Sequence, residues 1–153
     1  MRPITMHDHG RMLRILDRLE FFSTLSSIEK IELIKAKNMF VLAEPGERII
    51  ERGTRGNCFY VLISGAVGVG AATGEEGHFA TLGPGEVFGE VAFLGGTERG
   101  ADVVADEQSI LFWLGRASMD KLAAPLREKI KDQLILRLVR RVESLNQQLH
   151  GAA

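Results

Sequence analysis

Glu90 and Arg99 are the residues with the clearest chemistry, and both lie in a glycine-rich stretch that runs from Phe88 to Val103. The planar fork of N–H donors on arginine suits a phosphate group, whereas a carboxylate accepts hydrogen bonds from sugar hydroxyls. Glycines beside the arginine let backbone N–H groups come close to an anion. These residues predict a pocket for a ligand with one phosphate and one sugar. In isolation they are more typical of a tight turn with a surface ion pair, so the surrounding elements decide the interpretation.

Those elements divide the chain into three parts, which we expect to form a single domain over residues 1–153. Residues 11–37 have the apolar spacing of helices. Residues 39–115 contain about eight short apolar runs separated by turns at intervals of about 8–12 residues, which indicates an antiparallel β-roll or jelly roll. The longest run, Cys58–Ile63, should be a strand buried on both faces. Helical spacing returns over residues 117–149, so the predicted fold class is α+β and mainly β.

The N-terminal helices carry one clear boundary signal. Ser26 and Glu29 have the spacing of a capping box, which predicts a helix that begins just after Ser26. We expect that helix to bury its four apolar residues, namely Ile28, Ile31, Leu33 and Ile34.

The C-terminal part is a long helix with an apolar stripe. Residues 126–149 contain no glycine or proline and would form a helix of about 36 Å at 1.5 Å per residue. Apolar residues recur every three or four positions, at Leu126, Ile130, Leu134, Leu138, Val142, Leu145 and Leu149. One face could cover the β-roll and another could meet a partner helix, so a homodimer through this helix is an arrangement that the stripe allows. The basic residues between them are typical of a solvated face, and we expect no direct contact with nucleic acid.

The composition excludes several classes of protein. The net charge is −1, which gives no overall attraction to nucleic acid or membranes. No apolar run approaches the roughly 20 residues of a membrane-spanning helix. The N-terminal residues do not resemble a signal peptide, and the single cysteine, Cys58, suits a reducing compartment, so we expect a cytoplasmic protein without disulfides. His7 and His9 lack the further ligands that a metal site needs.

The order of helices, glycine-punctuated β-roll and long helix resembles the cyclic nucleotide-binding domain found in catabolite activators and in regulatory subunits of protein kinase A. The likeness extends from about Leu13 to Leu149 and is most specific at Phe88–Val103, FGEVAFLGGTERGADV, which is similar to the family's phosphate-binding cassette. The nine-residue spacing from the acid at 90 to the arginine at 99 is kept. The residues in register are Phe88, Gly89, Glu90, Ala92, Leu94, Gly96, Thr97, Arg99, Ala101 and Val103.

This resemblance implies a role for each matching residue. Arg99 would pair with the exocyclic oxygens of a cyclic phosphate, and Glu90 would accept a hydrogen bond from the ribose 2′-hydroxyl. Beside Phe88, backbone N–H groups would complete the cradle near Gly89, Val91, Ala92, Gly100 and Ala101. The implied ligand is cAMP or cGMP. The implied protein is a sensor whose C-terminal helix closes over the base and acts on an unidentified downstream protein. We expect no catalytic residue, no metal and no cofactor.

Four residues depart from the cassette pattern, and one of them is Gly95, which replaces a larger residue. Glu98 replaces the usual proline and puts a negative charge beside Arg99, and Gly100 replaces an alanine or serine. Asp102 occupies the place of a threonine whose hydroxyl is associated with a preference for guanine, which favours cAMP over cGMP.

Three other interpretations remain open. The chain could be the ligand-binding fragment of a larger transcription factor, channel or kinase, although its start at Met1 favours a small intact protein. A transcription factor needs a helix-turn-helix module, which residues 1–153 do not contain. A cupin-type enzyme would need several histidines inside the roll, and only His78 lies in a predicted strand. A degenerate domain that binds nothing is disfavoured by the presence of both Glu90 and Arg99.

Overall fold

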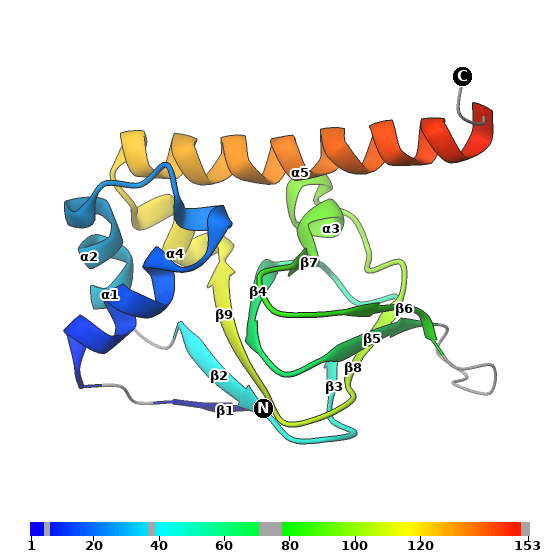
Figure 1. Cartoon of the computed structure of the whole chain (residues 1–153), viewed down its shortest axis with the longest axis horizontal. Helices are drawn as coiled ribbons and strands as arrows, with labels where there is room; N and C mark the ends of the chain where they lie inside the picture. The colour runs from blue at the N-terminus through cyan, green and yellow to red at the C-terminus, as the bar shows by residue number, and fades with distance from the viewer. Residues whose placement is uncertain (5–6, 37–38, 71–77, 151–153) are drawn as a thin grey trace.

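The computed structural model describes residues 1–4, 7–36, 39–70 and 78–150, and Figure 1 shows their arrangement. In chain order, the elements are β1 (Arg2–Pro3), α1 (His9–Asp17), the 3₁₀ helix η1 (Glu20–Phe22), α2 (Ser27–Lys35), β2 (Phe40–Ala43), β3 (Arg48–Ile50), β4 (Cys58–Ser64), β5 (Val67–Gly70), β6 (His78–Leu82), β7 (Val87–Phe88), α3 (Glu90–Gly95), β8 (Asp102–Ala105), β9 (Ser109–Gly115), α4 (Arg116–Lys121) and α5 (Ala124–His150).

The strands form two antiparallel sheets, as a β-roll requires. One sheet has the order β1-β2-β9-β4-β7 and the other has the order β3-β8-β5-β6. β4 is buried on both faces, as predicted. Phe59 and Val61 belong to the core under the helices, whereas Tyr60 and Leu62 belong to the core between the sheets. This division follows from the alternation of side chains along a strand, because both faces of β4 are covered. The predicted α+β, mainly β class is therefore confirmed.

α2 confirms one prediction and corrects another. The backbone N–H of Glu29 donates to Ser26 Oγ at 3.1 Å, and the backbone N–H of Ser26 donates to Glu29 Oε1 at 2.9 Å, so the capping box is present. Leu33 and Ile34 are buried, but Ile28 and Ile31 are 81% and 37% exposed. Their predicted burial was wrong because a nine-residue helix on the surface places one side against the core, and Ile28 in its first turn faces outward.

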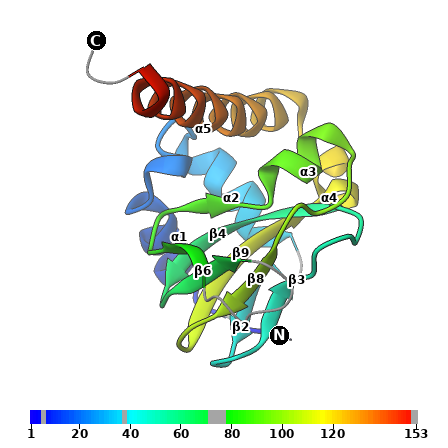
Figure 2. The ribbon, with the colours of Figure 1, turned by 90° about the vertical axis from the view of Figure 1, so that its right-hand side faces the viewer.

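α5 lies across one end of the roll, with α3 beneath it in both views (Figures 1 and 2). Its first half is anchored through the buried side chains Leu126, Ile130 and Leu134. The apolar stripe continues beyond the contact with the core, and Val142 and Leu145 are half exposed. None of the helices in the described part of the chain is long and apolar enough to cross a membrane.

A charged contact ties α5 to α2 and should make stability depend on pH. Lys129 Nζ lies 2.7 Å from Glu29 Oε1, and this hydrogen bond, followed by that from the Ser26 backbone, lowers the pKa of Glu29 below its ordinary value of 4.5. A carboxylate whose pKa is lower in the folded protein stabilises it above the unfolded pKa, and the benefit is lost as the pH falls through the folded pKa.

We therefore expect Glu29→Gln to destabilise the protein by about 1 kcal/mol or less at pH 7, since ion pairs near the surface are weak. Glutamine keeps the capping-box hydrogen bond, so the substitution isolates the charge. Urea unfolding of both proteins between pH 7 and pH 3 measures the difference, which should shrink below pH 4.5. A difference that stays constant across this range would show that the carboxylate's charge is not responsible.

Candidate functional site

A cavity of about 570 Å³ lies between the roll, α3 and α5. The eight residues that the sequence analysis assigned to a ligand-binding site all line this cavity: Phe88, Gly89, Glu90, Val91, Ala92, Arg99, Gly100 and Ala101. Apolar side chains from four strands complete the roll's side of the cavity, at Ile50, Val69, Ala80, Leu82 and Val103. The cavity thus combines four charged side chains, at Glu90, Glu98, Arg99 and Arg141, with an apolar wall. A mainly apolar wall with a few polar groups is the usual composition of a small-molecule site.

Arg99 is a buried cation in the wall of this cavity. Its side chain is held by two backbone carbonyls, because Nη1 donates to Gly89 O and Nη2 donates to Cys58 O, both at 2.6 Å. The residue is only 7% exposed. Within the described part of the chain, none of the ion pairs gives Arg99 a carboxylate partner. Burying a cation without a counter-charge is costly, so the site suits an anion that supplies one.

Gly89 explains how the guanidinium of Arg99 fits against the backbone. Its φ is +82°, in the left-handed region that favours glycine, and a Cβ built there would lie 2.9 Å from Arg99 Nη1. Both the turn that precedes α3 and the position of Arg99 therefore require a glycine at position 89.

Replacing Gly89 with alanine should both strain the backbone and displace Arg99. Gly85→Ala is a matched control, because Gly85 has a φ of +90° but open space where a Cβ would be. The backbone strain alone costs about 1–2 kcal/mol, and urea unfolding should show that loss in both variants and a further loss only in Gly89→Ala. Equal destabilisation of the two would mean that Arg99 adjusts without cost.

Glu90 is the second buried charge, and α5 supplies its partner. Glu90 is 4% exposed, and its Oε1 lies 3.4 Å from Nη1 of Arg141, whose side chain is 53% exposed. Arg141 and Leu145 also line the cavity. Sequence reasoning missed both residues, because they lie about 40 positions beyond Val103, the last residue of the cassette. The only signal that could have found them is the predicted closure of the long helix over the site.

The departures from the cassette pattern have separate explanations. Glu98 is exposed and lines the cavity, so a negative charge does lie on the wall beside Arg99. Asp102 is 4% exposed, and its Oδ1 accepts a hydrogen bond at 2.7 Å from the backbone N–H of Arg52. Asp102 therefore joins β8 to the loop after β3, and it does not line the cavity. Gly100 has no atom within 4 Å of the place where a Cβ would be.

The aromatic residues around the site mainly build the core. Tyr60 stacks on Phe88 with ring centroids 5.1 Å apart, which supports the strand that leads into the cassette. Burial raises the pKa of the Tyr60 hydroxyl far above its ordinary value, so this group stays neutral. Phe93 and Phe112 are buried, and Trp113 is partly buried and packs against the core between the sheets. In the described ranges, no group of three or more histidine, cysteine, aspartate or glutamate residues could hold a metal ion.

Comparisons with known proteins add an independent observation. A family model described as "Cyclic nucleotide-binding domain" matches residues 40–125, which include most of the roll, the cassette and the start of α5. A cAMP-dependent protein kinase regulatory subunit from Yarrowia lipolytica is 35% identical over 117 residues, which are 76% of this chain and 31% of that protein. The chain thus spans about a third of this relative's length.

Two solved structures are also similar. The catabolite activator protein of Thermus thermophilus has a TM-score of 0.70 and 30% identity, covering 85% of this chain and 61% of that one. The regulatory subunit of a cAMP-independent protein kinase A from Trypanosoma brucei has a TM-score of 0.65 and 28% identity, covering 81% and 44%. Since the family model covers more than half of the residues and the same fold recurs in these structures, the chain belongs to the cyclic nucleotide-binding domain family.

Proposed function

We propose that this domain binds one cyclic mononucleotide in the cavity between α3, α5 and the roll, and that it is a regulatory binding module without catalytic activity. The observation that carries the proposal is the buried guanidinium of Arg99, which lies in the cavity wall with no carboxylate partner among the described residues. A cyclic phosphate would supply the missing negative charge. Planar donors on Arg99 match two phosphate oxygens, so one side chain can hold the ligand's charged group.

The other residues of the cavity would orient the ligand. Glu90 would accept a hydrogen bond from the ribose 2′-hydroxyl, and backbone around Gly89, Val91 and Ala92 would face the phosphate. Phe88, Gly100 and Ala101 would complete the wall, and the apolar strands would face the base.

We propose cAMP rather than cGMP. The family resemblance associates a preference for guanine with a threonine hydroxyl at the position that Asp102 occupies in this chain. The Asp102 carboxylate instead accepts a hydrogen bond from the backbone N–H of Arg52.

Ligand binding would move α5. Arg141 on α5 pairs with Glu90, which is the group that a ribose hydroxyl would use. A ligand that engages Glu90 changes the contact that holds this part of α5 to α3. It shifts the equilibrium between two positions of the helix only to the extent that its affinity for the two positions differs. We propose that residues 1–153 work as one cytoplasmic domain in which this movement signals to a downstream protein. The relative's name makes a kinase catalytic subunit one candidate for that partner.

Thermal unfolding with cAMP, cGMP and 5′-AMP tests the proposed function. A ligand present at 100 times its Kd stabilises the folded protein by about 2.7 kcal/mol, which corresponds to a rise in Tm of about 5–10 °C for a domain of this size. We expect such a rise with cAMP, a smaller one with cGMP and little with 5′-AMP, which has the same base and sugar but an open phosphate. The proposal fails if neither cyclic nucleotide raises Tm, or if 5′-AMP raises it equally.

A homodimer through α5 is a second part of the proposal. Six apolar residues of α5 remain at least one third exposed: Ile135, Leu136, Val139, Val142, Leu145 and Leu149. A second copy of the same helix could cover them by coiled-coil-like packing. Light scattering over a range of concentrations should then give the mass of a dimer. A monomer mass at every concentration would remove this part of the proposal without affecting ligand binding.

A further inference from the structure

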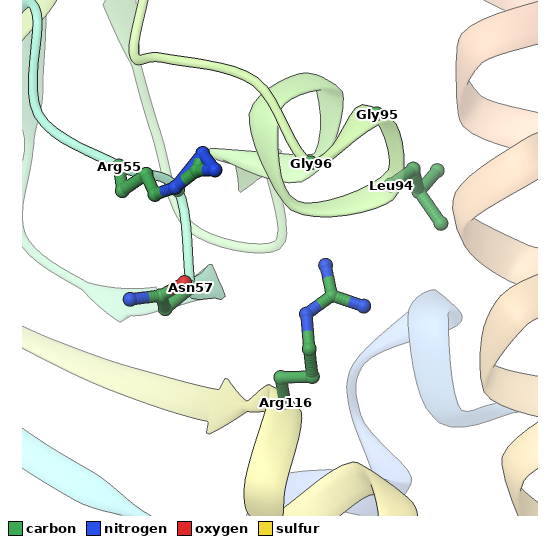
Figure 3. Close-up of a pocket in the computed structure, with 7 residues that line it drawn as sticks. Arg55, Asn57, Leu94, Gly95, Gly96 and Arg116 are labelled. Carbon is green, nitrogen blue, oxygen red and sulfur yellow. The ribbon is translucent and has the colours of Figure 1, made fainter.

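A second cavity, of about 330 Å³, lies beside the end of α3 and shares no lining residue with the first. Its wall combines three parts of the chain: the loop between β3 and β4, the C-terminal end of α3, and the start of α4. The lining residues are Arg55, Gly56, Asn57, Leu94, Gly95, Gly96 and Arg116. Figure 3 shows Arg55 and Arg116 on two sides of this space, with the turn at Gly95 and Gly96 above it.

Both charged side chains that line this cavity are positive. Two guanidinium groups line it and no carboxylate does. Arg55 has no ion pair with a carboxylate of the described residues. Glu98 is paired with Arg55 through the backbone, but it lines the first cavity instead. Two arginines that face one concave space without acidic residues favour an anion.

Arg116 is already fixed in position for such a ligand. Its Nη2 donates to Phe93 O, and its guanidinium carbon lies 4.9 Å from the centroid of the Phe93 ring. These contacts occupy one N–H and one face of the group, and a guanidinium has five N–H donors in a fixed plane. The remaining donors can bind an anion without a large loss of side-chain freedom.

Gly95 and Gly96 leave this side of the cavity open, because they have no side chains. A Cβ built at Gly96 would meet no atom within 4 Å, and one built at Gly95 would meet only Thr97 at 3.5 Å. Side chains at these positions would extend over open space beside α3.

Because the cavity is larger than a phosphate group alone, it can also hold part of a sugar. We propose that this cavity binds the phosphate group of a small phosphorylated metabolite, independently of the cyclic nucleotide site.

A titration followed by two-dimensional NMR tests this proposal. Inorganic phosphate and ribose 5-phosphate are added separately to the full chain at constant ionic strength, since salt screens such contacts. The signals followed are the backbone amides of Gly95 and Gly96 and the side-chain Nε–H groups of Arg55 and Arg116. We expect saturable changes at these four residues with both probes, and tighter binding of ribose 5-phosphate.

Three variants locate the site. Arg55→Gln should lower the affinity for both probes at least tenfold, as measured from the remaining signals of the cavity, whereas Arg52→Gln should not change either affinity. Arg52 is a matched control because it is an exposed arginine of the same loop that lines neither cavity. Arg116→Gln should weaken binding too, but Arg116 also contacts α3, so the Arg55 variant is the cleaner test.

Three results would overturn the proposal. They are changes that do not saturate, changes that are equal in all variants, and changes confined to Arg99 and Gly100, which would place the phosphate in the first cavity. The outcome does not depend on the proposed function, because the titration contains no cyclic nucleotide and the two cavities have separate signals.

Discussion

Replacing Arg99 with alanine is expected to lower the affinity for cyclic nucleotide by at least a hundredfold. Arg99 is the buried cation that faces the cavity, and the proposed contact uses two charge-assisted hydrogen bonds to phosphate oxygens. Hydrogen bonds to charged groups contribute about 1.5–3 kcal/mol each, so losing two costs about 3–6 kcal/mol. Each 1.4 kcal/mol corresponds to about a tenfold change in Kd. Titration calorimetry of both proteins with cAMP measures the difference directly.

The control for this experiment must separate binding from folding. Arg99 also donates to the carbonyls of Gly89 and Cys58, so its removal leaves two buried acceptors and should destabilise the protein. Thermal unfolding of the variant establishes that it is folded at the temperature of the titration. Arg52→Ala removes an exposed arginine and should bind as the parent does. If folded Arg99→Ala bound cAMP as tightly as the parent, the proposed phosphate site would be wrong.

Leu134→Ala should cause a large loss of stability, because this residue anchors α5 to the core. Leu134 is 0% exposed and packs in the core beneath the helices, where α5 meets the roll and the N-terminal helices. Truncating a fully buried leucine typically costs about 2–5 kcal/mol, because it removes apolar contacts and leaves a cavity. Urea unfolding should therefore show a lower midpoint for this variant than for the parent.

An exposed residue of similar size provides the comparison. Ile28 in α2 is 81% exposed, so Ile28→Ala should change stability by no more than about 0.5 kcal/mol. The contrast between the two variants measures how firmly the first half of α5 is anchored. Equal, small effects would mean that the first half of α5 does not pack on the core as described, so the proposed movement of α5 would lack an anchored end.

The features that could be predicted from the sequence depend on residues close together in the chain. The capping box of Ser26 and Glu29 spans four residues, and the apolar run of β4 is continuous. The cassette is also one contiguous segment, and for that reason its eight nominated residues all line one cavity. Their roles in binding a ligand stay a prediction.

The features that were missed depend on contacts between distant parts of the chain. Arg141 in the second half of α5 pairs with Glu90 in the cassette. Neither the apolar spacing of α5 nor the cassette motif predicts this pair, because it depends on where α5 lies in the folded protein. Burial of Ile28 was predicted from its apolar character alone, although α2 places only one side against the core. The cavity between Arg55 and Arg116 likewise forms where three separate segments meet, and no local pattern marks it.

Calorimetric titration with cAMP and cGMP measures directly whether the cavity at Arg99 and Glu90 binds a cyclic mononucleotide, as proposed. The protein must first be shown to be free of nucleotide by its absorbance and by chromatography of a denatured sample, since a ligand retained from purification would mask binding. We expect binding at one site per chain with micromolar or lower Kd, tighter for cAMP than for cGMP. Absence of heat with both ligands, in protein shown to be empty and folded, would contradict the proposal and would favour a domain that has lost this ligand.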